Sequence, residues 1–338
     1  MKTVRAAILG FGTVGQGIFN IAQQRRDEFR EQHQVELAIV KVLVTDVNRA
    51  GRKLPDGFDA ALLTDKIEDV LASGPIDVLF ECMVGEQPAF DYVRTAVEQH
   101  ACAVVTANKV MFAKHGAAVK ELVGAVGRQV GYEACVAGGV PVIKTIQNMR
   151  LVQHITKVEG ILNGTTNFIL TNMRTNPGKS YEATLQEAQE KGYAEADPYN
   201  DVSGMDAFSK LMVVSALAFG AQPVWSEVPV VGIQEITAEK VKEASEKQQR
   251  YRHVASTELV VSESGQRQVV ASVRPMLVDA QHALYAVEDV QNAVAISTDY
   301  LGVVTLMGAG AGMYPTASVM VEDWLTFVLQ DKLKAGTA

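Results

Sequence analysis

The sequence of 338 residues has few cysteines, no excess of positive charge and no long apolar run. Its three cysteines, Cys82, Cys102 and Cys135, form no CxxC pair and no metal-finger spacing, so we expect neither a disulfide framework nor a structural zinc site. They lie in apolar, strand-like stretches, and we interpret them as small buried hydrophobic residues.

The net charge of −8 argues against a protein that works by covering nucleic-acid phosphates or an anionic membrane. The longest apolar run, Leu211 to Phe219, is far too short to span a bilayer, and the apolar start of the chain is too short for a signal peptide. We therefore predict a soluble, cytoplasmic protein without nucleic-acid or membrane partners.

The length and composition indicate a globular protein with two domains. With 48% hydrophobic and 21% charged residues the composition is ordinary, and single cores stop growing at about 250 to 300 residues. We place a dinucleotide-binding domain at residues 1–141. Residues 142–338 form a catalytic and dimerisation region whose last helix returns to the first domain.

A glycine-rich turn lies between a predicted buried strand, 3–9, and a predicted helix, 16–24. This is the arrangement in which G-x-G-x-x-G binds a dinucleotide pyrophosphate at the amino end of a helix. A purely structural turn is the alternative. The candidate cofactor-binding residues of the turn are Gly10, Phe11, Gly12, Thr13, Val14 and Gly15.

The second predicted strand, 37–45, ends at Asp46, whose carboxylate would accept the adenosine ribose hydroxyls or cap the next turn. Further strand-like runs alternate with helical ones, which predicts an α/β fold with a doubly wound parallel sheet. Ligands of such sheets bind beyond the carboxyl ends of the strands. Gly85, in segment 83–87, and Lys109 follow two strands and are candidates there.

A fifth predicted strand, 129–134, runs into two glycines and a proline that end at Pro141. Outward carbonyls of this turn, together with the carboxylate of Glu133, would suit a hard cation. A plain hinge between domains is the alternative.

The second domain contains charges where an apolar pattern predicts none. A helix from about Met205 to Gly220 is apolar around nearly its whole circumference and should be buried. It nevertheless carries Asp206 and Lys210, four residues apart and so on one face. An exposed ion pair is the alternative, but unpaired buried charges are costly and pairs are kept mainly where function supports them.

The charged residues of the second domain indicate the type of reaction and of substrate. Hydride transfer to or from a carbonyl carbon changes the charge on its oxygen, so a cationic proton donor lowers the barrier, and Lys210 and Lys109 are the candidates. Glu195 or Asp201, in the acidic loop before the helix, would suit the ammonium group of a small zwitterionic substrate. A glycine-rich segment, 308–312, precedes a predicted helix, 317–329, and would close over the cofactor or be a flexible turn.

Five motifs of the sequence, and the order in which they occur, resemble those of the homoserine dehydrogenase family over essentially the whole chain. The matching segments are GFGTVG, TANK ending at Lys109, YEACVAGGVP at 132–141, GILNGTTNFIL at 160–170, and the run A-x-x-x-G-Y-x-x-x-D-P-x-x-D-x-x-G-x-D-x-x-x-K at 188–210. The resemblance implies an oxidoreductase of threonine and methionine biosynthesis that interconverts L-homoserine and L-aspartate 4-semialdehyde with NAD or NADP.

The resemblance also implies roles for individual residues. Lys210 would donate and accept the proton with Asp206 beside it, Glu195 and Asp201 would bind homoserine, and Lys109 would lie between nicotinamide and substrate. A sodium-type cation would bind Glu133 and the carbonyls of Val136, Gly138 and Val140, and Gly312 would lie near the cofactor. Family members are dimers, so we expect a homodimer.

The sequence departs from the family in two respects. It stops soon after Leu329, so we expect no carboxyl-terminal regulatory domain and no kinase fusion. Members that prefer NADP often have an arginine where this chain has Thr45, although Arg49, Arg52 or Lys53 would still meet a 2′-phosphate. The preference between NAD and NADP stays open, and Thr45 with Asp46 favours less than strict NADP dependence.

Two other functions compete with this one. Aspartate-semialdehyde dehydrogenase, or another two-domain Rossmann oxidoreductase, is one alternative, but the semialdehyde enzyme needs an activated thiolate, and no cysteine here has a helix-start setting. A non-catalytic dinucleotide sensor is the other. It would have no need of Lys210 within an apolar helix.

Overall fold

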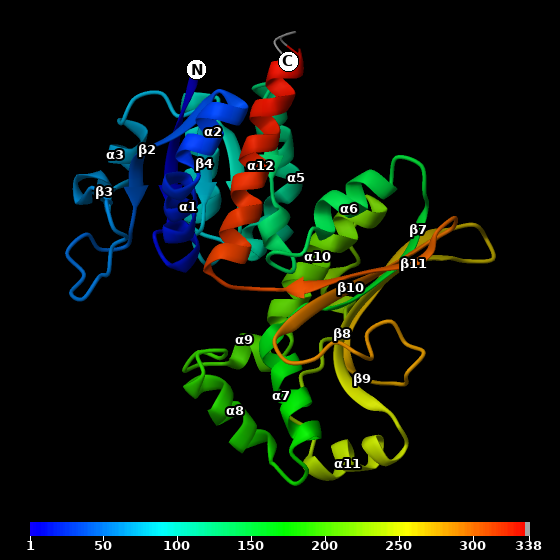
Figure 1. The fold of residues 1–338 in the computed structure, drawn as a ribbon. Coiled ribbons are helices and arrows are strands. Elements are labelled where there is room, and N and C mark those ends of the chain that lie inside the picture. The colour runs from blue at the N-terminus through cyan, green and yellow to red at the C-terminus, as the bar shows by residue number, and fades with distance from the viewer. Residues whose placement is uncertain (335–338) are drawn as a thin grey trace. The chain divides into compact units, whose positions relative to one another are not determined.

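The computed structural model describes residues 1–334, with side chains up to Asp331. The chain forms two compact units: Met1–Gly138 with the described chain from Gly312 onward, and Gly139–Ala311 (Figure 1). No helix among the described residues is both long and apolar enough to cross a membrane.

The first unit is built on a six-stranded parallel sheet with the order β3-β2-β1-β4-β5-β6. This is the doubly wound arrangement, in which the strand order reverses between β1 and β4. The α/β prediction is therefore confirmed. The strands are β1 Lys2–Leu9, β2 Val35–Leu43, β3 Leu63–Thr64, β4 Val78–Glu81, β5 Ala103–Thr106 and β6 Val130–Gly131.

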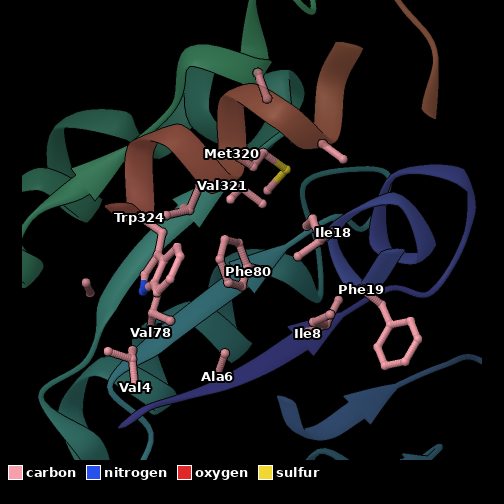
Figure 2. Close-up of a cluster of buried hydrophobic side chains, with 14 of the residues drawn as sticks. Val4, Ala6, Ile8, Ile18, Phe19, Val78, Phe80, Met320, Val321 and Trp324 are labelled. Atoms are coloured by element: carbon pink, nitrogen blue, oxygen red, sulfur yellow. The ribbon is translucent and has the colours of Figure 1, made fainter. Parts of the chain in front are cut away.

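The last helix of the chain, α12, belongs to this unit and packs beside its first helix, α1. Apolar side chains of α1 and α12 cover one face of the sheet, where Met320, Val321 and Trp324 lie over Phe80 and its neighbours (Figure 2). The helices are α1 Thr13–Gln24, α2 Arg26–His33, α3 Ile67–Leu71, α4 Ala89–His100, α5 Lys109–Ala125 and α12 Met313–Lys334, with short 3₁₀ turns η1 Ala60–Leu62 and η2 Glu133–Cys135.

Several predicted element boundaries differ from the structure: the helix predicted at 16–24 begins at Thr13, and the strand predicted at 37–45 is Val35–Leu43. The predicted strand 129–134 is a strand only at Val130–Gly131, where Gly131 lies so close to Asp323 of α12 that a Cβ on Gly131 would meet the Asp323 side chain at 2.6 Å. The chain then turns, and Asp323 Oδ2 accepts a hydrogen bond from the Glu133 backbone at 3.1 Å. The last helix begins at Met313 instead of residue 317, and Gly308 and Ala309 of the predicted glycine-rich segment belong to strand β11 of the second unit.

The second unit is an antiparallel five-stranded sheet with helices packed against it. The sheet order is β11-β10-β7-β8-β9, and α7 and α10 contact its central strands. The strands are β7 Ile155–Ile161, β8 Arg250–Val261, β9 Arg267–Val278, β10 Gln291–Thr298 and β11 Gly302–Ala309. The helices are α6 Val142–Met149, α7 Gly164–Thr175, α8 Tyr181–Glu190, α9 Tyr199–Val202, α10 Met205–Phe219 and α11 Ala238–Glu246, with the 3₁₀ turn η3 Trp225–Glu227.

Helix α10 is buried, as its composition predicted. Its side chains from Phe208 to Ala218 are largely inaccessible to solvent, including the row Leu211, Met212, Val213 and Val214. The helix ends at Gly220, whose φ of 74° is the left-handed conformation that favours glycine at a helix end. The charged pair predicted on this helix therefore lies on an element that is otherwise core.

We expect replacement of Trp324 by alanine to destabilise the first unit. The indole is 1% exposed and packs edge-on against Phe29 with ring centroids 5.6 Å apart. Removing a buried tryptophan leaves a cavity and typically costs about 3–5 kcal/mol. Urea unfolding of Trp324→Ala measures this, with Leu329→Ala, an exposed position of the same helix, as the control. Equal losses in the two variants would contradict the prediction.

Candidate active site

The glycine turn between β1 and α1 has the geometry that a dinucleotide needs. Gly10 has a φ of +93°, and a Cβ there would meet the carbonyl oxygen of Cys82 at 2.7 Å. A Cβ on Gly15 would meet the Gly10 carbonyl oxygen at 2.2 Å. A Cβ on Gly12, just before α1, would have nothing within 4 Å. Open space thus lies at the amino end of α1, which suits an anionic pyrophosphate.

Asp46 follows β2 and is exposed. Its Oδ1 accepts a hydrogen bond from the backbone of Asn48 at 2.8 Å, so the carboxylate caps the next turn. Arg52 donates to the Asp46 carbonyl oxygen at 2.6 Å. A hollow beside the glycine turn is lined by Phe11, Gly12, Thr13, Gln16, Arg49, Ala50, Gly51, Arg52, Lys53 and Met313. Three cations therefore lie in the same hollow as the turn.

The ends of β4 and β5 are joined by a buried carboxyl group that sequence reasoning missed. Glu81 Oε2 accepts a hydrogen bond from Thr106 Oγ1 at 2.5 Å, and Oε1 accepts one from the Met83 backbone at 2.8 Å. Burial raises the pKa of Glu81 to about 7, against the opposing effect of these hydrogen bonds. Lys109 is the first residue of α5. The Asn108 side chain caps this helix, because its Oδ1 accepts a hydrogen bond from the Met111 backbone at 3.1 Å.

The second unit brings Asp206 and Lys210 together, as their spacing predicted. Lys210 Nζ donates to Asp206 Oδ2 at 2.6 Å and to the carbonyl oxygen of Leu162 at 2.7 Å. The two charged side chains are only 13% and 11% exposed. An ion pair so far removed from water is unlike the solvated surface pair that was the alternative.

Asn163 connects Asp206 to the acidic segment before α10. Its Nδ2 donates to Asp206 Oδ2 at 2.9 Å and to Asp201 Oδ1 at 2.8 Å, while its Oδ1 accepts from the Thr166 backbone at 2.8 Å. The structure therefore gathers Lys210, Asp206 and Asp201 around this asparagine. In the sequence, Asn163 was seen only as a member of the motif at 160–170, and no role was assigned to it.

The remaining predicted site residues lie elsewhere. Glu195 is exposed in the loop between α8 and α9, where its carbonyl oxygen accepts a hydrogen bond from Gln189 at 3.1 Å. Gly85, with a φ of +89°, accepts one from Asn108 at 2.7 Å. Gly312 has a φ of +125° and immediately precedes α12.

The residues proposed for a cation lie in the stretch of chain where the first unit ends and the second begins. Glu133 is buried in η2, Val136 and Gly138 follow it in the first unit, and Val140 belongs to the second. Within the described residues no three His, Cys, Asp or Glu side chains form a metal-binding group.

The cysteines are unsuited to nucleophilic chemistry. All three are free thiols. Burial raises the pKa of Cys102 to about 12 and the pKa values of Cys82 and Cys135 well above the usual thiol value. Because the thiolate is the reactive form, a mechanism that requires a cysteine nucleophile is disfavoured.

Comparison with known protein families identifies the two parts of the chain. Residues 141–325 match the family model described as homoserine dehydrogenase. Residues 10–133 match the model described as the NAD-binding domain of homoserine dehydrogenase.

The chain belongs to the homoserine dehydrogenase family. It is therefore an oxidoreductase that acts on a small molecule and uses a nicotinamide dinucleotide.

Relatives and solved structures agree with this assignment. The homoserine dehydrogenase of Lactococcus lactis is 36% identical over 98% of this chain and 75% of its own, and that of Bacillus subtilis is 35% identical over 96% and 72%. The structure of a homoserine dehydrogenase from Thiobacillus denitrificans matches with a TM-score of 0.88, at 34% identity, over 98% of this chain and 75% of that one. A hyperthermophilic archaeal homoserine dehydrogenase in complex with NADPH matches with a TM-score of 0.77, at 25% identity, over 98% of both chains.

We expect alanine at Gly12 to weaken dinucleotide binding without destabilising the protein. The φ of Gly12 is −81°, which alanine tolerates, and the added methyl group meets open space that only a bound ligand would occupy. Titration of intrinsic fluorescence with dinucleotide, beside thermal unfolding, measures both effects. Gly15→Ala is the contrasting variant and should lower stability, because its methyl group meets the Gly10 carbonyl oxygen. Unchanged affinity in Gly12→Ala would contradict the proposed pyrophosphate position.

We expect Glu81 to make the stability of the protein depend on pH. Because its pKa rises from 4.5 to about 7 on folding, the folded protein keeps a proton between these pH values that the unfolded chain has released. The stabilisation from this proton is greatest at the acidic end and is lost as pH rises through the window. Thermal unfolding of wild type and Glu81→Gln across this range should show wild type losing stability relative to the variant. If the stabilities of wild type and Glu81→Gln change with pH in the same way, the raised pKa of Glu81 is contradicted.

Proposed function

We propose that this chain interconverts L-homoserine and L-aspartate 4-semialdehyde, as a step of threonine and methionine biosynthesis, with Lys210 moving the proton. Oxidation of the alcohol removes a hydride from carbon and a proton from oxygen, and reduction of the aldehyde returns both. When bound, the nicotinamide dinucleotide accepts or supplies the hydride. The Lys210 amine takes the proton in one direction, and its ammonium group returns it in the other.

The observation that carries this proposal is the position of the Lys210 ammonium group. It is little exposed, and two acceptors, Asp206 Oδ2 and the Leu162 carbonyl oxygen, orient it on a helix that is otherwise apolar. Keeping an ion pair out of water costs desolvation energy that a well-packed apolar side chain avoids. A dinucleotide sensor without catalytic activity would gain nothing from such a residue.

Substrate binding is proposed for the carboxylates before α10 and for Lys109. Asp201, held by Asn163 beside Asp206, would attract the ammonium group of an amino acid. The exposed Glu195 and the first-unit residue Lys109 complete the set by resemblance to the family.

For the cofactor, we propose the turn Gly10–Gly15 with Asp46, Gly85, Lys109 and Gly312. The open space at Gly12 fits a pyrophosphate. A 2′-phosphate in the adjacent hollow would meet Arg49, Arg52 and Lys53, so the proposal includes NADP beside NAD. The NADPH complex of the archaeal relative agrees with this inclusion.

A bound sodium-type cation and a homodimer are further parts of the proposal. The cation would be held by Glu133 and the carbonyl oxygens of Val136, Gly138 and Val140. The dimer is supported by β11, an edge strand of its sheet, which leaves Val303 and Met307 58% and 55% exposed. An apolar edge strand is a surface that proteins usually cover.

We expect Lys210→Ala to lower turnover strongly while dinucleotide binding survives. Loss of a general acid–base typically lowers kcat about 10²- to 10⁴-fold. The measurement follows the absorbance of the reduced nicotinamide with homoserine, separately with NAD and NADP. Lys242→Ala is the matched control, because Lys242 also lies four residues from a carboxylate on a helix but is 74% exposed.

The outcomes of this assay separate the parts of the proposal. Unchanged turnover in Lys210→Ala would refute the role of Lys210. Wild-type protein without turnover on homoserine with either dinucleotide would refute the reaction itself.

We expect Val303→Asp to weaken self-association. A charge on the exposed side of β11 would have to be buried in a sheet-mediated dimer, which is unfavourable without a partner. Sedimentation velocity of wild type should give about twice the chain mass, and the variant should shift toward a single chain. Val224→Asp, at another exposed apolar position of the same unit, should stay dimeric. A monomeric wild type would disprove the dimer.

A further inference from the structure

Glu81 is the last residue of β4, at the point where the strand order of the parallel sheet reverses. Its side chain is fully buried, and it reaches both neighbouring loops. It accepts hydrogen bonds from the Met83 backbone at 2.8 Å, from Thr106 Oγ1 at 2.5 Å and from Asn108 Nδ2 at 3.3 Å. One carboxyl group therefore joins the loop that follows β4 to the loop that follows β5.

The loop after β4 is also the surface against which the glycine turn packs. The Cys82 backbone donates to the Leu9 carbonyl oxygen at 2.7 Å, and Gly10 lies directly against the Cys82 carbonyl oxygen. By fixing Met83, Glu81 fixes the segment that Gly10 touches. The position of the glycine turn thus depends on the conformation that Glu81 imposes on the loop after β4.

The loop after β5 leads directly to Lys109. Thr106 Oγ1 accepts a hydrogen bond from the Asn108 backbone at 2.9 Å while it donates to Glu81. The Asn108 side chain caps α5 through Met111 and donates to the Gly85 carbonyl oxygen at 2.7 Å. The direction in which Lys109 leaves the sheet is therefore set by a chain of hydrogen bonds that ends at Glu81.

We propose that Glu81 is a positioning residue, which holds the glycine turn and Lys109 in one fixed arrangement through its hydrogen bonds to Met83, Thr106 and Asn108. The inference rests on the proposed function, because Lys109 acts on cofactor and substrate only if that function is correct. Glu81 itself touches neither of them in this proposal.

Simple core packing does not account for a carboxyl group at this position. The residue before it in β4, Phe80, and its partner in β1, Leu9, are apolar and buried, and an apolar residue would avoid the cost of desolvation. A side chain that accepts three hydrogen bonds from two loops instead specifies their relative position. Reacting groups displaced by about 1 Å lose about 10²-fold in rate, so such a constraint matters for catalysis.

The test compares Glu81→Gln with Asp77→Asn. Glutamine keeps the shape, and its amide oxygen can still accept from Met83 and Asn108, but its amide nitrogen cannot accept the hydrogen bond from Thr106 Oγ1 as a carboxylate oxygen does. Asp77 lies just before the same strand, at its opposite end, and accepts a hydrogen bond from the Arg5 backbone at 2.8 Å, so it is a matched carboxylate far from the loops. For each variant we would measure kcat, the two KM values, the dissociation constant of the dinucleotide and thermal stability.

We expect Glu81→Gln to lower kcat about 10-fold or more and to weaken dinucleotide binding several-fold, while the KM for homoserine changes little. Asp77→Asn should leave all kinetic values near wild type, even where it lowers stability. If Glu81→Gln does not fold, Thr106→Val removes one of the same hydrogen bonds at nearly constant shape and should shift kcat and dinucleotide affinity in the same direction.

A change in stability alone, with kcat and dinucleotide affinity unaltered in Glu81→Gln, would overturn the proposal. So would an equal loss of kcat in Asp77→Asn. If the wild type does not turn over homoserine, the proposed function fails. The dinucleotide dissociation constants of the two variants then still decide whether Glu81 positions the glycine turn.

Discussion

The hydrogen-bonded ion pair of Lys210 and Asp206 is the interaction around which the second unit is organised. An ammonium group at this depth in a helix of core residues is tolerated only with acceptors arranged around it. Asp206 provides one acceptor and the Leu162 carbonyl, at the end of β7, provides the other. Asn163, the next residue, extends the network to Asp201. The end of β7, the start of α7, α9 and α10 must therefore all be in place before Lys210 has a defined direction.

In the first unit, the loops at the carboxyl ends of the parallel strands must likewise be held in place by specific contacts. Strands end there with unpaired backbone groups, and the loops that follow must be fixed without regular pairing. Close packing of glycine against backbone fixes the turn after β1, and the buried carboxyl group of Glu81 fixes the loops after β4 and β5. Both units thus use polar groups with little access to water, where hydrogen bonds constrain geometry most strongly.

Much of the fold was predictable because its signals are local. The glycine turn between β1 and α1, the parallel α/β alternation, and the buried helix with its four-residue charge spacing are all patterns within short stretches of chain. Element boundaries were predicted less well, and some involve distant contacts: beyond β6 the chain turns where the Glu133 backbone donates to Asp323 of α12, 190 residues away. Glu81 and Asn163 were missed for the same reason, since their partners lie 25 and 43 residues away in the chain.

The sequence by itself determined the class of fold and the residue types available for proton transfer, and its motifs carried the resemblance to the family, because these features lie within short stretches of the chain. Only the tertiary structure decided that Lys210 is held by a backbone carbonyl as well as by Asp206, that Asp201 and not Glu195 is tied to this pair, and that Asp46 caps its own turn. The reason is physical. Buried hydrogen bonds form between polar groups that are brought together when strands and helices far apart in the sequence pack. The local sequence pattern does not predict which groups these are.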